Sequence, residues 1–195
     1  MQKKCIIGLI LLLCLPLITL AQSTPPIDLP GDYSVEMEMN SGTMAMKTKL
    51  FVKDKGELTR SEVNMMGNSS IAIVRKDKGV MWMVLPSQKM YMEQPLTQAK
   101  APSIPGAIPT GTWEKQGEEK VDGQDCEKWK CDMQANGQAV SVTYWVNKST
   151  KIPAQVEAGG MITQWKNFKA ATPDASLFEV PANFRKMAMP QMLGK

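Results

Sequence analysis

The sequence contains no histidine among its 195 residues. This absence excludes the Ser-His-Asp and Cys-His arrangements, because both use an imidazole to activate the nucleophile. It also removes the side chain that zinc and iron sites use most often as a ligand. The phosphate-binding Gly-Lys-Ser/Thr motif and the dinucleotide motif Gly-x-Gly-x-x-Gly are absent as well. We therefore predict a protein that is not an enzyme and that holds no cofactor.

Cysteine is scarce, and only Cys126 and Cys131 lie outside the N-terminal apolar segment. Their spacing differs from the Cys-x-x-Cys of thioredoxin-like redox sites. Residues 125–133 have the pattern of a strand, on which residues five apart face opposite sides and lie ~16 Å apart. A disulfide requires Cα atoms within ~7 Å of each other. We favour two packed thiols, and a disulfide across a local turn or bulge is the alternative.

Long apolar runs are missing, apart from one at the N-terminus. Cys5–Leu20 is almost wholly apolar, but it is shorter than the ~20 residues that a membrane-spanning helix needs. Two lysines precede this run, and Thr19 and Ala21 place small residues just before Gln22, in the order of a signal peptide. We predict cleavage between Ala21 and Gln22 and a periplasmic or secreted protein. An uncleaved membrane anchor is the alternative.

Positive and negative charges are nearly balanced. Without Lys3 and Lys4, 21 of the 23 basic residues remain against 19 acidic ones, a net charge of +2. The sequence has no basic stripe and no polybasic patch, so neither nucleic acid nor an anionic membrane surface is an expected partner. The 174 residues that follow a cut behind residue 21 suit one domain.

Period-2 alternation of apolar and polar residues dominates the rest of the chain. Turn signals such as Asp77–Gly79 separate the alternating segments, and short connections of this kind join antiparallel neighbours. A long meander must curl to cover its apolar face, as a barrel, a half-barrel or a sandwich. The predicted strands are Tyr33–Met39, Thr43–Lys53, Glu57–Met65, Ser70–Arg75, Val80–Leu85, Lys89–Glu93, Thr112–Glu119, Asp125–Met133, Ala139–Asn147, Ala154–Ala158 and Ile162–Lys169.

Three segments interrupt this pattern. Residues 22–31 are polar and hold three prolines, which predicts a flexible tether. Gln94–Gly111 holds four prolines, and because proline cannot donate to a strand ladder, we predict a long loop there. This loop is either a lid over a binding site or a flexible crossover. Thr172–Phe178 starts with a capping-type residue followed by proline, which predicts a short helical turn.

Methionine is abundant, with 16 residues, and much of it occurs as Met-x-Met pairs. Residues two apart on a strand share a face, so each strand pair puts two thioethers on one side. Three interpretations stay open: core filling, a deformable pocket for an apolar ligand, and a Cu(I) site of soft thioether ligands. The pairs on predicted strands are Met37/Met39, Met44/Met46, Met81/Met83 and Met90/Met92.

Several sequence motifs together resemble a known family. They are Gly79–Pro86, Gln88–Met92, Tyr144–Asn147 with Ile152 and Pro153, and Pro173–Pro181. From Asp32 to Met187 the chain resembles the bacterial envelope family "domain of unknown function 4412", which is grouped with the LolA/LolB-like lipoprotein-localisation superfamily. The resemblance implies a single antiparallel, strongly curved meander sheet, an incomplete β-barrel, with an apolar concave face. In the carrier members of the superfamily this hollow holds acyl chains.

The prediction is therefore a signal peptide (1–21), a tether (22–31), a LolA-like β domain (32–187) and a C-terminal tail (188–195). We predict a non-catalytic envelope protein whose Met-rich concave face binds a lipid or another apolar small molecule. Two alternatives are a Cu(I)-binding protein that uses Met81, Met83, Met90 and Met92, and a structural or protein-interaction domain with a filled core. The predicted ligand-binding residues are Tyr33, Met37, Met39, Met44, Met46, Met81, Met83, Met90 and Met92.

Overall fold

The computed structural model describes residues 26–41, 44–65, 67–97, 108–135 and 137–187. The predicted signal peptide, the predicted tail and the middle of the predicted proline-rich loop lie outside these residues. Within them, no helix has the length and the hydropathy to span a membrane.

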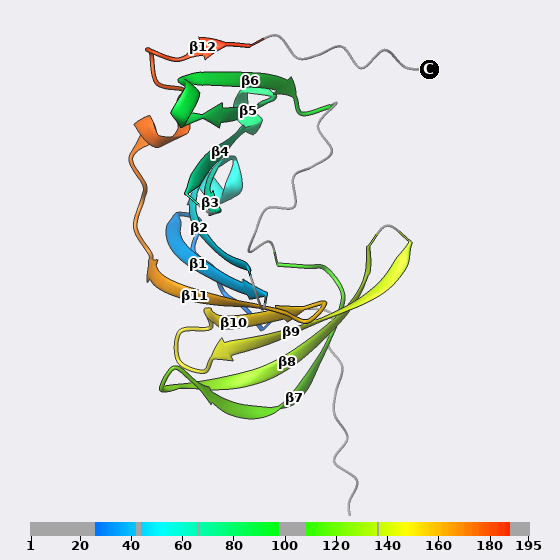
Figure 1. Ribbon diagram of the computed structural model, residues 1–195. Coiled ribbons are helices and arrows are strands. Elements are labelled where there is room, and N and C mark those ends of the chain that lie inside the picture. Colours follow the sequence, from blue (N-terminus) through cyan, green and yellow to red (C-terminus); the bar gives the residue numbers. More distant parts are fainter. Residues whose placement is uncertain (1–25, 42–43, 66, 98–107, 136, 188–195) are drawn as a thin grey trace, which may run out of the picture.

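The described residues form one sheet of twelve strands in the order β12-β6-β5-β4-β3-β2-β1-β11-β10-β9-β8-β7 (Figure 1). The predicted mainly β fold with a single sheet is confirmed, and each of the eleven predicted strands is present. The strands are β1 Tyr33–Ser41, β2 Met44–Lys53, β3 Leu58–Met65, β4 Asn68–Arg75, β5 Val80–Leu85, β6 Met90–Pro95, β7 Thr112–Val121, β8 Gln124–Ala135, β9 Gln138–Asn147, β10 Pro153–Ala158, β11 Met161–Lys169 and β12 Arg185–Lys186.

The sequence does not predict β12, which pairs with β6 in parallel, whereas all other pairs are antiparallel. It has only two residues, so it shows no alternation. Its backbone is instead tied to the edge of the sheet by hydrogen bonds from Arg185 N to Lys89 O (2.9 Å) and from Met187 N to Tyr91 O (2.8 Å).

The two faces of the sheet are named here by its bend in Figure 1. The concave face bears Tyr33, Val35 and Met37, and a core cluster around these residues includes Trp165. A second cluster on the same face, around Trp113 and its neighbours, lies over β7, β8 and β9. The convex face bears the alternate residues. On β1 these alternate residues are the polar Ser34, Glu36 and Glu38. The convex face is apolar over β3, β4 and β5, and a smaller cluster surrounds Trp145.

The C-terminal segment covers part of the convex face. Here Leu177 and Phe178 pack against Leu58, Ile73 and Trp82. A 3-10 turn, η4 (Ala175–Phe178), positions them, and the side chain of Asp174 accepts a hydrogen bond from Ser176 N at its start. The sequence predicts a helical turn here with a cap at Thr172. Instead the cap is Asp174.

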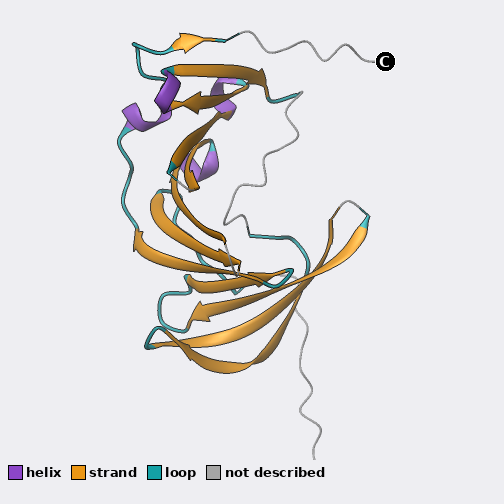
Figure 2. Ribbon diagram, viewed as in Figure 1, coloured by secondary structure: helices purple, strands orange, loops and turns teal. Residues whose placement is uncertain are grey.

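Three further 3-10 turns connect strands: η1 (Asp54–Gly56), η2 (Lys76–Lys78) and η3 (Pro86–Gln88) (Figure 2). The sequence predicts only one helical turn, because at these sites it shows Gly and Pro turn signals rather than a helical period. These turns matter for the site, because η1 and η2 place lysines beside the concave face.

The N-terminal segment crosses the concave face. Ile27 packs against one concave-face cluster and Leu29 against the other. Backbone hydrogen bonds hold this segment, from Asp28 N to Lys151 O (3.0 Å) and from Lys55 N to Gly31 O (2.9 Å). Residues 26–31 of the predicted flexible tether are thus docked on the sheet, because two apolar side chains alternate with its polar and proline residues.

The two cysteines of the domain are free and fully buried, which confirms the favoured prediction. They lie on opposite faces, as residues five apart on one strand must. Cys131 packs with Trp113 and Val142 on the concave face, and Cys126 packs with Trp145 on the convex face. Burial raises the pKa of both thiols, so the reactive thiolate is disfavoured.

We expect both thiols to react with a chromogenic disulfide reagent at least ~10³-fold more slowly in the native protein than in denaturant. The reason is that access requires an opening that costs about 5 kcal/mol or more. A Ser149→Cys variant gives the matched control, because Ser149 is exposed and its new thiol should react at once. A native cysteine that reacts as fast as residue 149, or a thiol that is lost without reductant, would contradict this packing.

Candidate functional site

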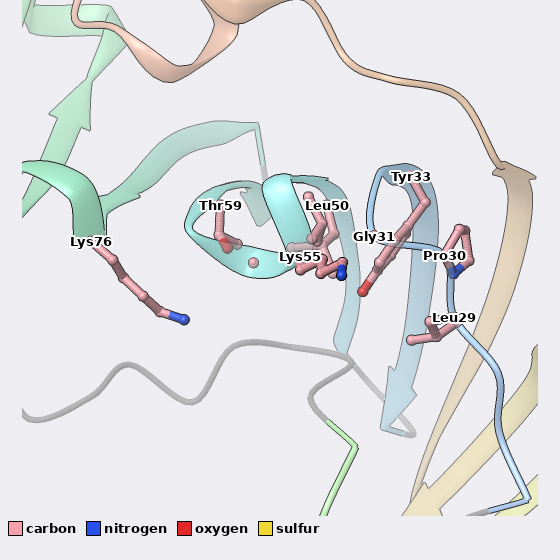
Figure 3. Close-up of a pocket in the computed structure, with 10 residues that line it drawn as sticks. Leu29, Pro30, Gly31, Tyr33, Leu50, Lys55, Thr59 and Lys76 are labelled. Atoms are coloured by element: carbon pink, nitrogen blue, oxygen red, sulfur yellow. The ribbon is translucent and has the colours of Figure 1, made fainter.

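A cavity of about 490 Å³ opens on the concave face where β1, β2 and β3 meet the N-terminal segment (Figure 3). Its size falls within the ~300–1,000 Å³ of small-molecule sites. The lining residues are Leu29, Pro30, Gly31, Tyr33, Leu50, Val52, Lys55, Gly56, Thr59 and Lys76.

The floor of the cavity follows from strand register. Tyr33 lies directly opposite Val52, and Val52 lies directly opposite Thr59, so these residues form one row across three strands. Leu50 shares the face because it lies two residues from Val52 on β2. The side chains of Leu50, Val52 and Tyr33 are buried. The floor is therefore mainly apolar, because Tyr33, Leu50 and Val52 belong to the core of the sheet, and it includes the buried Thr59.

The mouth of the cavity is polar and basic. Lys55 comes from η1 and Lys76 from η2, and Figure 3 shows the Lys76 side chain extending toward the cavity. Lys76 Nζ lies 3.9 Å from Glu57 Oε1, and both side chains are about half exposed, so the pairing is weak. Among the described residues Lys55 has no ion pair, and no carboxylate lines the cavity. An anionic group at this mouth would meet two lysines.

Two hydroxyls supplement the lysines. The Tyr33 hydroxyl points toward the cavity in Figure 3, and Thr59 lines the cavity beside β2. Burial raises the pKa of Tyr33 to about 12, so its phenol is neutral at physiological pH and can donate a hydrogen bond. The site can thus combine apolar contact in its floor with polar contact at its mouth.

Asp32 holds the turn that carries Lys55. Its carboxylate accepts hydrogen bonds from Asp54 N (2.7 Å) and from the Thr172 hydroxyl (2.7 Å). Both hydrogen bonds lower the pKa of Asp32, and the bond from Thr172 has the larger effect. Lys55 itself has a left-handed backbone with φ of 55°, and its N–H donates to Gly31 O. The geometry of the mouth is therefore fixed from three parts of the chain.

A second cavity, of about 620 Å³, lies beside the first, and Pro30 borders both. It is more polar, since its lining includes Asp28, Gln124, Thr150 and Asn167 as well as Trp165 and Phe168. We regard the first cavity as the better candidate site because Leu50 and Val52 give it a buried and mainly apolar floor.

Of the predicted ligand-binding residues, only Tyr33 lines the first cavity. Register places the methionines on the same concave face as Tyr33, but along other parts of the strands. Met37 and Met81 are buried in the sheet, whereas Met39, Met46, Met83, Met90 and Met92 are half-buried. Met44 begins β2, and its side chain lies outside the described part of the structure.

The predicted copper residues converge only in part. Met83 lies directly opposite Met92, but Met81 lies opposite Gln94 and Met90 lies opposite Leu85. One pair of the four thioethers therefore meets directly across the two strands.

The fold and the site together define the class of protein. It is an open, single-sheet β domain with an apolar cavity on its concave face. The chain belongs to the family described as "Domain of unknown function (DUF4412)", whose model matches residues 31–150. The family resemblance predicted from the sequence is thereby confirmed. No curated protein matches the chain.

One of the solved structures that match the chain shares its fold. An uncharacterized conserved protein from Thermus thermophilus matches with a TM-score of 0.59 at 12% identity, over 82% of this chain and 91% of that one. LprF from Mycobacterium bovis matches with a TM-score of 0.45 at 12% identity, over 79% and 90% of the two chains. A putative outer membrane lipoprotein-sorting protein domain from Vibrio parahaemolyticus matches with a TM-score of 0.37 at 12% identity, over 78% and 91%.

Proposed function

We propose that this protein is a non-catalytic protein of the bacterial envelope that binds an apolar ligand with an anionic head in the cavity of its concave face. A single acyl chain that ends in a carboxylate has this chemistry. The observation that favours it most is the combination of an apolar floor with a mouth that holds two lysines and no carboxylate.

The energetics suit an amphiphile. Each Å² of apolar surface that leaves water contributes roughly 25 cal/mol, so an acyl chain gains most of its affinity from Leu29, Leu50 and Val52. Exposed charge pairs contribute about 0–1 kcal/mol each. Lys55 and Lys76 therefore contribute little to the total affinity, and their main effect is a preference for an anionic head group. The half-buried methionines lie along other parts of the same concave face and are not part of the proposed acyl cavity.

Export is part of this proposal. The signal-peptide pattern of residues 1–21 supports removal of that segment between Ala21 and Gln22. A thiol count in denaturant also tests this point, because the processed chain holds two cysteines and the unprocessed chain holds four. An intact mass that still includes Met1 would contradict it.

Titration of the purified protein with a 16-carbon fatty acid, followed by displacement of a fluorescent acyl probe, tests the binding. We expect saturable binding, and at least about tenfold weaker binding for Leu29→Trp, because a larger side chain there fills the cavity. Leu177→Trp is the matched control on the convex face and should bind as the wild type does. Circular dichroism confirms that both variants fold.

A second pair of variants tests the preference for an anionic head group. The double variant Lys55→Met/Lys76→Met should bind the fatty acid about 5–10-fold more weakly, while its affinity for the alcohol of equal length stays the same. Lys169→Met, a change of an exposed lysine outside the lining, serves as the control. Native mass spectrometry that finds only bare protein, together with no binding of either amphiphile, would favour the alternative of a structural or protein-interaction domain.

A further inference from the structure

Three methionines form a row at one end of the strands whose other end floors the cavity. Met39 of β1 lies directly opposite Met46 of β2, and Met46 lies directly opposite Met65 of β3. Directly opposite residues on antiparallel strands have Cα atoms ~4.5–5.5 Å apart, and their side chains share a face. The three thioethers therefore extend from adjacent positions on the concave face.

Core packing does not account for this row. Met65 is 45% exposed, the highest exposure among the large apolar residues of the described chain. Met39 and Met46 are half-buried, whereas Met37, one step further into the sheet on β1, is only 2% exposed. The buried core thus ends before the row begins, and all three methionines are at least partly exposed to solvent.

The chemistry of the row is specific. Thioethers are soft, neutral donors that select Cu(I) over the harder divalent ions. Methionine has three rotatable side-chain bonds, so the two outer residues can bring their sulfur atoms toward that of the middle one. Met83 and Met92 provide only a pair of directly opposite residues. Within the described residues, no group of three or more Cys, Asp or Glu suits a metal ion, so no harder donor set competes.

We infer that Met39, Met46 and Met65 form a Cu(I) site. It is separate from the acyl cavity, because Tyr33, Val52 and Thr59 lie six residues further along the same three strands, or ~20 Å at 3.3 Å per residue. The two sites can therefore be tested, and can fail, independently.

Anaerobic titration of the purified protein with Cu(I) against a chromogenic Cu(I) chelator tests the site. We expect one Cu(I) per chain with a Kd below about micromolar. The triple variant Met39→Leu/Met46→Leu/Met65→Leu should bind at least 100-fold more weakly. Leucine keeps the size and the apolar character of methionine, so the fold should persist, and circular dichroism checks it. The control variant Met83→Leu/Met92→Leu should bind Cu(I) as the wild type does.

Ag(I), which has the same preference for soft ligands and does not change its redox state under these conditions, identifies the ligands. In protein with ¹³C-methyl methionine, Ag(I) should shift three methyl resonances, and those three should be missing from the triple variant. Unchanged Cu(I) affinity in the triple variant, loss of affinity in the Met83/Met92 control, or equal affinity for Zn(II) would overturn the inference. Fatty-acid binding by the triple variant should equal that of the wild type, whatever the metal result.

Discussion

Replacement of Phe178 by alanine will lower the free energy of unfolding by about 3–5 kcal/mol. The ring is fully buried on the convex face, where it packs with Leu58, Ile73, Trp82 and Val84. No other part of the described chain takes its place in this cluster, so a cavity would remain. Urea denaturation followed by tryptophan fluorescence measures the change.

The backbone around Phe178 limits relaxation into that cavity. Arg60 donates to Leu177 O (2.8 Å), and the buried Arg75 donates to Phe178 O (3.2 Å). Arg75 also pairs with Asp77 and with Glu179, so the segment is tied to β3, β4 and η2. Because these bonds hold the turn in place after the ring is removed, the loss should be near the upper end of the range.

Leu177→Ala is the matched control for this prediction. Leu177 is the neighbour of Phe178 in η4, but it is only half-buried, so its truncation should cost about 1 kcal/mol. An equal effect of the two substitutions would mean that the segment contributes through its backbone alone, and the packing described here would be wrong.

The strands could be predicted because the sequence encodes them locally. In β1 apolar and polar residues alternate over most of the strand, and β5 is a short apolar run between a glycine turn and a proline turn. Two predicted strands begin one residue too early, at Glu57 and at Lys89. In the structure both residues belong to the turns that precede β3 and β6. Short turns account for the antiparallel pairing within β1–β6 and within β7–β11. The pairing of β1 with β11, which joins these two runs into one sheet, connects distant parts of the chain, and only the family resemblance implied the single sheet.

The cavity could not be predicted from alternation. Its floor residues Leu50 and Val52 do continue the face of Met46, so this part of the signal was available. Its mouth depends on η1 and η2, which bring together Lys55 and Lys76, 21 residues apart, and on the hydrogen bond from Lys76 N to Glu57 O (3.0 Å). The docked segment that holds Leu29 completes it. These are tertiary relations that no local pattern records.

The methionine pattern predicted the face but not the position of the cavity. A count of Met-x-Met pairs favours Met81–Met92 as a site, since two pairs lie close together there. Register instead places Met65, which has no methionine two residues away, beside Met39 and Met46. Cross-strand neighbours are set by hairpin register, and register depends on turn lengths that the sequence indicates only roughly.

At the opposite end of the sheet, Trp113→Ala will also lower the free energy of unfolding by about 3–5 kcal/mol. Trp113 anchors the edge strand β7 to the concave-face core and is fully buried. Its ring centroid lies 5.1 Å from that of Tyr144, and Cys131 lies directly opposite it on β8. Loss of this side chain should therefore weaken the pairing of β7 more than the pairing of the other strands. We expect faster hydrogen exchange of the β7 amides in the variant.

Trp113→Phe separates the two contributions of this side chain. Within the described structure the Trp113 indole N–H is buried without a hydrogen-bond partner, a state that costs about 1–3 kcal/mol. Phenylalanine removes that cost while it fills most of the volume, so we expect a destabilisation of less than about 1.5 kcal/mol. In Trp145→Phe the balance is opposite, because the Trp145 indole donates to Glu119 Oε2 (2.8 Å) and a hydrogen bond is lost. Trp113→Phe should therefore be the more stable of the two variants, and the reverse order would mean that the Trp113 N–H has a partner, such as a buried water.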